Sequence, residues 1–216
     1  MYSLEPKNNF KNNSCLKSDS LLENSNFRVI SNLNLYKQRL DSLDQMTPFD
    51  LSYNEKVIPF INSYLGKNKL LISRMMMLKQ LYFPLFEQQL DKYGLPLEFK
   101  YLPIVESALN PKAKSPSGAT GLWQFMYLTG KEFGLDVTSY LDERQDPIKS
   151  TEAACQYFVK LYEKFGDWNL VLAAYNGGPG YLQRKINTVN SYNFWELYPH
   201  LRQETRNYIP TFMAVN

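Results

Sequence analysis

Apolar residues recur through most of this chain at spacings of three and four, the period of an α-helix. No segment alternates apolar and polar residues over the length of a strand. We therefore predict an all-α, or mainly α, fold, and allow a small hairpin only in the polar loop around 113–118. The clearest helical run spans 147–166, and its apolar residues are Ile148, Ala153, Ala154, Tyr157, Phe158, Leu161, Tyr162 and Phe165.

Start and stop signals set the bounds of the predicted helices. Ser52 is a good N-cap for a helix over 53–65, which Gly66 should end. Asn68 should start a longer helix through residue 93, and Pro84 should kink that helix or divide it in two. Further helices are expected from Glu98 to Ala108, from Gly121, over 147–166, over 168–176 with Asp167 as its cap, over 181–186 before a loop at 187–192, and over 204–214.

The first part of the chain has a different composition from the rest. Residues 1–26 are rich in Asn, Ser and Lys with little periodicity, which indicates a mobile tail or a loosely docked arm. Residues 26–46 carry some apolar side chains and fit either an extended segment or a short helix. Because proline disfavours helix in the residue before it, Thr47-Pro48 marks a boundary. The remaining residues are enough for one domain with a substantial core.

Charge and residue usage exclude several classes of function. The net charge is +3, and no block of Lys and Arg with interleaved aromatics indicates a nucleic-acid partner. Cys15 and Cys155 lie far apart, His200 is the lone histidine, and no metal-ligand spacing occurs, so we expect no zinc and no other cofactor. No run approaches the ~18 apolar residues of a membrane span, and no secretory signal is visible at Met1.

The stretch 95–134 concentrates the residues that could carry chemistry. Leu97, Tyr101, Ile104, Val105 and Ala108 can share one helical face, and residue 106 inside this pattern is a glutamate. A carboxylate among apolar neighbours loses hydration, its pKa rises, and it can then act as a general acid near neutral pH. The alternative is an ordinary solvated glutamate on a helix.

A polar loop with Ser115 and Gly118 follows this helix, and a turn of residues suited to a sugar follows the loop. Thr120 and Gly121 are start signals for a short helix, in which Trp123 and Gln124 offer an aromatic ring and a primary amide. Aromatic faces and amides are what a carbohydrate cleft needs. The alternative is a core helix with the amide in water.

Three ordered motifs carry a family resemblance. Glu106-Ser107, then Gly121-Leu122-Trp123-Gln124, then Ala174-Tyr175-Asn176 resemble the motifs of the lytic transglycosylases, lysozyme-like enzymes that cut peptidoglycan. The context LPIVESALNP…SGATGLWQF is most similar to the membrane-bound type D branch. The similarity runs from about residue 53 to the end. It implies a polar arm at 1–46, a helical N-terminal extension at 47–94, and a lysozyme-like catalytic domain at 95–216.

The resemblance also implies a mechanism with one carboxylate. Glu106 would protonate the bridging oxygen of the β-1,4 bond between N-acetylmuramic acid and N-acetylglucosamine. It would then take the proton of the muramic C6 hydroxyl as base, so that a 1,6-anhydro product forms without water. We expect no second acid across the cleft. The residues expected to orient glycan and acid are Ser115, Gln124, Tyr175, Asn176 and Tyr208, the last with an equally good alternative as a core tyrosine.

Several other residues are better explained by structure than by catalysis. Glu98 suits the first turn of its helix, and the acids of 142–146 suit a salt-bridged turn around Arg144, with Asp146 as a helix cap. The methionine triplet 75–77 could line a ligand surface, but flexible core filling is the favoured interpretation.

Two rival functions use the same residues. A muramidase or chitinase would use water as the nucleophile, and a non-catalytic glycan-binding module would not cut at all. With the family resemblance, the expected partner is the glycan strand of peptidoglycan and the expected location is the periplasm or cell envelope. We expect that the secretory signal has been removed, and that any membrane association depends on a segment outside this chain.

Overall fold

A computed structural model describes residues 33–51, 54–66 and 69–216. The chain divides into two compact units, 1–39 and 40–216, and the second carries all that follows. The expectations for the arm at 1–26, for Cys15, and for Ser52 and Asn68 as helix starts lie outside the described residues. In the described part, regular structure is helical, and strand-like pairing is confined to the isolated bridges Lys114–Thr120, Thr120–Phe125 and Val137–Asp142. The predicted all-α class is confirmed.

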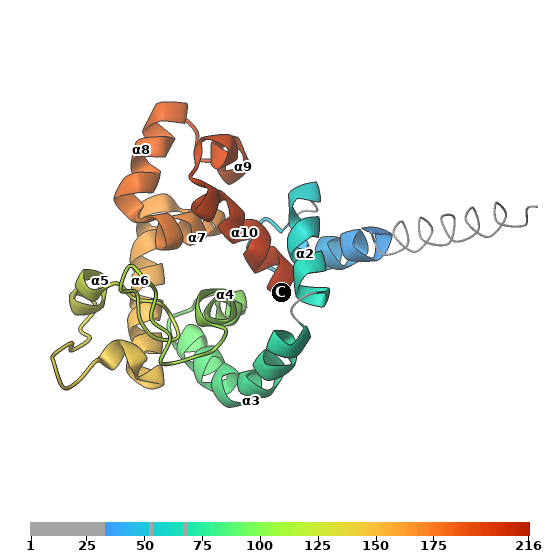
Figure 1. Ribbon diagram of the computed structural model, residues 1–216. Coiled ribbons are helices and arrows are strands. Elements are labelled where there is room, and N and C mark those ends of the chain that lie inside the picture. Colours follow the sequence, from blue (N-terminus) through green and yellow to red (C-terminus); the bar gives the residue numbers. More distant parts are fainter. Residues whose placement is uncertain (1–32, 52–53, 67–68) are drawn as a thin grey trace, which may run out of the picture. The chain divides into compact units, whose positions relative to one another are not determined.

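Figure 1 shows the described helices in their order along the chain. Short 3₁₀ turns (η) introduce or extend several of them. Residues 33–44 are helical, and the elements after them are η1 (Glu55–Val57), α2 (Ile58–Leu65), α3 (Lys69–Lys92), η2 (Leu97–Tyr101), α4 (Leu102–Ser107), α5 (Tyr127–Glu132), η3 (Glu143–Gln145), α6 (Pro147–Phe165), α7 (Trp168–Gly177), α8 (Pro179–Val189), α9 (Phe194–Leu197), η4 (Tyr198–His200) and α10 (Gln203–Val215).

The predicted caps of the central helices are confirmed. Asp146 accepts from the backbone N–H groups of Ile148 and Lys149 at the start of α6, and Asp167 accepts from Leu170 at the start of α7. These carboxylates satisfy amides that have no partner inside the helix. Between the two helices, Gly166 ends α6 in the left-handed conformation, with φ of 66°.

Pro84 does not divide its helix. Helix α3 runs through it without interruption, and Figure 1 shows that the helix bends. Pro84 lies on the exposed side, so the carbonyl that loses its partner one turn earlier can bond to water. Of the methionine triplet, only Met75 is buried; Met76 and Met77 are 51% and 69% exposed, so core filling was wrong for these two.

The helix predicted from Gly121 was also wrong. Residues 121–124 form a turn, and α5 begins only at Tyr127. Gly121 and Gln124 both have positive φ, 91° and 51°, which a right-handed helix does not accept. Reciprocal backbone hydrogen bonds between Thr120 and Phe125, 3.0 and 3.1 Å long, close this turn.

The segment after α7 contains more helix than expected. Helix α8 spans Pro179–Val189, so the predicted loop at 187–192 begins only at Asn190, which ends the helix with φ of 56°. Asparagine is one of the few residues that tolerate this left-handed conformation. Conversely, the segment after Glu98 contains less α-helix than expected. It is a 3₁₀ turn up to Tyr101 and an α-helix only from Leu102.

An aromatic core joins the turn at 121–124 to helices α3 and α6. Trp123 is fully buried, and its ring meets Phe86 of α3 and Phe158 of α6 edge-on at centroid distances of 5.2 and 5.8 Å. Its indole N–H donates to Thr151 Oγ1 at 2.9 Å, so the polar edge of the ring is satisfied inside the core. Helix α10 packs against α7, α4 and α2. The contact with α10 thus positions α4, which carries Glu106.

Candidate active site

Glu106 lies in the last turn of α4, just before the chain leaves that helix abruptly. Ala108 and Leu109 take φ of 51° and 60°, and their N–H groups bond back to the carbonyls of Ile104 and Pro103. This left-handed stop turns the chain away directly after the glutamate. The hydroxyl of Ser107 lies 2.9 Å from the carbonyl oxygen of Leu122. The end of α4 is therefore attached to the turn at 121–124.

The carboxyl group of Glu106 is held in a poorly solvated position. Burial raises its pKa from 4.5 to about 7; a hydrogen bond from Tyr208 opposes the shift, and the negative charge of Glu204 adds to it. The hydroxyl of Tyr208 donates to Oε1 of Glu106. The raised pKa expected from the apolar sequence pattern is therefore present, and near neutral pH the group can both give and take a proton.

Two adjoining hollows meet at Glu106 and share Val105, Ser115 and Gln124. We call the first the α10 hollow; its volume is about 440 Å³. It is lined by Val105, Glu106, Ser115, Ser117, Ala119, Gln124, Met126, Tyr175, Asn176, Glu204, Asn207, Tyr208 and Thr211.

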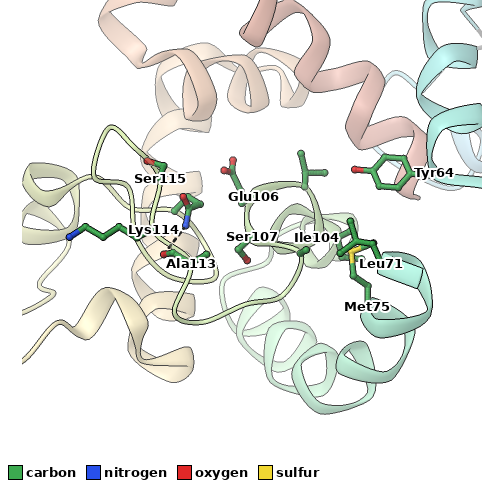
Figure 2. A pocket seen from close by; sticks show the side chains of 12 residues that line it. Tyr64, Leu71, Met75, Ile104, Glu106, Ser107, Ala113, Lys114 and Ser115 are labelled. Carbon is green, nitrogen blue, oxygen red and sulfur yellow. Dashed lines mark hydrogen bonds between the residues drawn. The ribbon is translucent and has the colours of Figure 1, made fainter. Parts of the chain in front are cut away.

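The second is the α3 hollow, with a volume of about 430 Å³, and Figure 2 shows it from close by. Its wall includes Tyr64 of α2 and side chains of α3. All six site residues predicted from the sequence line the α10 hollow, and Glu106, Ser115 and Gln124 also line the α3 hollow.

Ser115 and Gln124 belong to the loop that faces Glu106. The hydroxyl of Ser115 accepts from the backbone N–H of Ala119 at 3.0 Å. The amide nitrogen of Gln124 donates to the carbonyls of Gly121 at 2.9 Å and Ala113 at 3.3 Å. Both side chains therefore stabilise the loop, and the amide oxygen of Gln124 is not used in these bonds.

Tyr175 and Asn176 reach the hollow from the end of α7. The hydroxyl of Tyr175 donates to the carbonyl of Trp123 at 2.6 Å, which ties α7 to the turn at 121–124. The Oδ1 atom of Asn176 is buried and has no hydrogen-bond partner in the described part of the chain. A buried acceptor without a partner is costly, so this oxygen is suited to a donor from a ligand.

The sequence reasoning missed one wall of the hollow and expected no second acid there. Glu204, Asn207 and Thr211 line it together with Tyr208, and on α10 the pairs 204–207, 204–208, 207–211 and 208–211 are three or four residues apart. That spacing places them on one helical face. Glu204 brings a second carboxylate to the hollow, so the expectation of a single acid in the cleft was wrong. Helical periodicity counted from Tyr208 could have found it.

The other acids serve the structure. The guanidinium of Arg144 donates two hydrogen bonds, of 2.7 and 2.8 Å, to the carboxylate of Asp142 and lowers the pKa of that group. It also donates to the carbonyls of Gly118 and Phe125 at 3.0 and 3.1 Å, so the buried arginine fixes both ends of the loop that carries Thr120. The carboxylate of Asp146 does not pair with Arg144 and caps α6 instead.

The remaining candidates lie away from the two hollows. Glu98 lines neither of them, and Glu143 pairs with Lys149 and accepts from the N–H of Asp136. Trp123 and Phe125 are buried in the core and line neither hollow. Across the described ranges, no three His, Cys, Asp or Glu side chains are grouped so that they could hold a metal ion. None of the described helices is both long enough and apolar enough to span a bilayer.

Known proteins resemble this chain in sequence and in fold. Residues 84–198 match the family model "Transglycosylase SLT domain". The membrane-bound lytic murein transglycosylase D of Escherichia coli (strain K12) is 41% identical over 133 residues, which are 59% of this chain and 29% of that protein.

Two solved structures share the fold. The 70-kDa soluble lytic transglycosylase from Escherichia coli matches with a TM-score of 0.54 at 29% identity, over 62% of this chain and 23% of that one. A complex of the 70-kDa soluble lytic transglycosylase with bulgecin A matches with a TM-score of 0.57 at 26% identity, over 70% of this chain and 26% of the other. The chain thus spans less than a third of the length of these relatives, and the resemblance read from the three motifs is confirmed.

Proposed function

Because this chain belongs to the transglycosylase SLT domain family, we propose that it is a lytic transglycosylase of peptidoglycan. It cleaves the β-1,4 bond between N-acetylmuramic acid and N-acetylglucosamine and leaves a 1,6-anhydro ring on the muramic acid. The names of its relatives support murein as the substrate and the cell envelope as the location. Residues 95–216 form the catalytic part, and residues 47–94 are a helical extension packed on it.

One observation carries the proposal. Glu106, with a pKa of about 7, lies where the α10 and α3 hollows meet. A carboxyl group with this pKa is about half protonated at neutral pH, so it can serve first as acid and then as base. A glycan strand lying through both hollows would bring a glycosidic oxygen to this group.

The reaction needs no second protein carboxylate and no water. Glu106 donates its proton to the bridging oxygen while the bond from that oxygen to the anomeric carbon breaks. The carbonyl of the sugar's own N-acetyl group stabilises the positive charge that develops on the anomeric carbon. The C6 hydroxyl of the same ring then attacks that carbon, and its proton passes to the carboxylate. Bond making and breaking balance, and Glu106 ends in its starting state.

The other side chains of the α10 hollow orient the acid and the sugar. Tyr208 holds Oε1 of Glu106 through its hydroxyl, which leaves Oε2 to meet the glycosidic oxygen. The unpartnered Oδ1 of Asn176 accepts from an N-acetyl N–H or a ring hydroxyl. Tyr175 holds the turn that presents Gln124, and Ser115 faces the strand from the loop. These preformed contacts promote the reaction by orienting the reacting groups, and they take no part in the proton transfers themselves.

The mass of the reaction products tests this proposal. Purified peptidoglycan digested with the protein should release muropeptides that end in anhydromuramic acid, and the Glu106→Gln variant should release none. Mass spectrometry that shows reducing ends, heavier by one water, would contradict the transglycosylase reaction.

Hydrolysis is the second candidate because Glu204 lines the same hollow as Glu106. Hydrolytic glycosidases use a second carboxylate to activate water or to form a covalent intermediate. The same mass measurement separates the two reactions. If Glu204→Gln abolished release of a water-containing product, this glutamate would be the second catalytic group.

A further inference from the structure

The α3 hollow extends the groove beyond the catalytic glutamate toward the N-terminal helices. Figure 2 shows Tyr64 of α2, with Leu71 and Met75 of α3, on the far side of the hollow from Ser115. These three residues precede residue 84, where the family match begins. Tyr64, Leu71 and Met75 therefore belong to a part of the chain that the family model does not include.

The wall is mostly apolar and carries one phenol. Met75 is 5% exposed, Leu71 is 39% exposed, and Ile104 of α4 is partly buried beside them. The hydroxyl of Tyr64 points into the hollow in Figure 2, and among the described residues it has no hydrogen-bond partner. Burial raises the pKa of this tyrosine, so it stays neutral. Apolar walls with a few oriented polar groups are typical of small-molecule sites.

Among the residues that the structure describes, the wall presents no positive charge to a ligand. Of the described residues that line the α3 hollow, Glu106 and Lys114 are the charged ones. Figure 2 shows the side chain of Lys114 pointing away from it, and the ammonium group of this lysine helps to lower the pKa of Asp142. A ligand with carboxylate groups would therefore lie on apolar side chains without a counter-charge, which is unfavourable. A neutral ligand suits the wall better.

The wall is held in a fixed relation to the catalytic group. Helix α2, which carries Tyr64, packs against α10, and α10 carries Tyr208 with its hydrogen bond to Glu106. Helix α2 also packs against α3, which carries the other two side chains. The distance from wall to acid therefore depends on packed helices and not on a loop.

We infer that this wall is a binding subsite for a neutral N-acetylated sugar ring of the glycan strand, placed beyond the bond at Glu106. The inference rests on the proposed function, since the strand must already lie across the catalytic group. The apolar C–H face of the ring and the methyl of its acetamido group pack on Leu71, Met75 and Ile104. The hydroxyl of Tyr64 exchanges a hydrogen bond with a ring hydroxyl.

Binding of neutral oligosaccharides to a variant that cannot cleave tests the inference. The probes are the dimer, tetramer and hexamer of N-acetylglucosamine, added to Glu106→Gln and followed by titration calorimetry. We expect affinity to rise with length, since only longer oligomers reach both hollows. Adding Leu71→Ala or Tyr64→Phe should weaken hexamer binding about fivefold and leave dimer binding unchanged, because one apolar contact or one hydrogen bond is lost.

The matched control lies next to Leu71 on the same helix. Leu70 is 89% exposed and lines neither hollow, so Leu70→Ala in the same background should bind every oligomer as its parent does. Thermal unfolding of each variant shows that the fold is intact. Tyr64→Phe keeps the ring and so tests the hydroxyl alone.

The possible results separate this inference from the proposed function. Equal hexamer binding with and without Leu71→Ala would overturn the subsite, and anhydro products from the unaltered protein would still support the transglycosylase. The expected length dependence without any cleavage of peptidoglycan would uphold the subsite and reject that activity. Weakened binding of peptide-bearing muropeptides, with oligosaccharide binding unchanged, would mean that the wall binds the stem peptide and that the inference is wrong.

Discussion

The hydroxyl of Tyr208 donates a hydrogen bond to the carboxylate of Glu106, across 102 positions of the chain. Tyr208 is buried on α10, and Glu106 lies in the last turn of α4, so the packing of these two helices brings the groups together. The bond stabilises the charged form of the glutamate, whereas burial stabilises the neutral form. The balance between the two places the pKa near neutrality.

Replacing Glu106 by glutamine should raise stability at high pH. The pKa of this glutamate is about 7 in the folded chain and 4.5 ordinarily. Below the lower value both states are protonated; between the two values only the unfolded chain loses its proton, so stability falls as pH rises. Above the folded pKa the deficit is about 3 kcal/mol, and glutamine avoids it. Urea unfolding at pH 8 should show a more stable Glu106→Gln variant, with the difference lost at pH 4. A pH-independent difference would contradict the buried-acid account.

Tyr208→Phe should shift the pH profile of cleavage to higher pH. The phenol hydroxyl stabilises the ionised form of Glu106, so its loss raises the pKa further. Activity that requires the protonated acid then persists to higher pH, although its maximum falls because the carboxyl group is less well oriented. The measurement is the rate of release of soluble muropeptides against pH. An unshifted profile would show that this bond does not tune the acid.

Glu204→Gln should shift the same profile in the opposite direction. The negative charge of Glu204 raises the pKa of Glu106, so its removal lowers that pKa and cleavage is lost at lower pH. Because Glu204 is exposed, the shift should shrink at high salt. The anhydro product should persist. A shift in the same direction as for Tyr208→Phe would refute the electrostatic explanation.

Arg144→Lys should destabilise the loop opposite Glu106. The arginine is 6% exposed and donates to Asp142, Gly118 and Phe125, a fork that a lysine ammonium cannot reproduce. We expect a loss of about 2–4 kcal/mol in the free energy of unfolding. The control is Lys131→Met, which removes an exposed ion pair with Asp136 and should cost less than about 1 kcal/mol. Similar losses of unfolding free energy in both variants would show that Arg144 does not hold this loop in place.

Gly121→Ala should be far more harmful than Gly118→Ala. Both glycines have positive φ, 91° and 88°, so both variants carry backbone strain of about 1–2 kcal/mol. Only at position 121 would the new methyl lie 1.8 Å from a backbone atom, the carbonyl oxygen of Arg144. We expect Gly121→Ala to lose more than about 3 kcal/mol and most of its cleavage activity. Equal unfolding midpoints for the two variants would show that the close approach is not maintained in solution.

Local sequence signals predicted the helical framework well. Asp146 and Asp167 are caps because their carboxylates bond to amides two and three residues ahead. The apolar setting of Glu106 correctly indicated a raised pKa. The three motifs indicated the family and a set of residues that do line one hollow. In each case the feature depends on interactions between residues that are close in the sequence, or on residues that belong to one of the three motifs.

The predictions failed where contacts between residues far apart in the sequence determine the structure. The turn at 121–124 has the composition of a helix, but Gly121 fits against the backbone of Arg144 and takes a left-handed conformation there. Glu204 lies four residues before Tyr208 on α10, so periodicity could place the two on one face, but only the tertiary structure shows that both line the hollow with Glu106. The burial of Met75 and the exposure of Met76 and Met77 likewise depend on which helices pack beside α3.

The sequence by itself determined where α6 and α7 begin and which glutamate stands among apolar neighbours, because capping and helical periodicity act over a few residues. Only the tertiary structure decided that Tyr208 and Glu204 adjust the same carboxyl group, and that α2 and α3 extend the groove beyond it. Those relations depend on how buried side chains fill space between helices far apart in the chain, which no local pattern encodes.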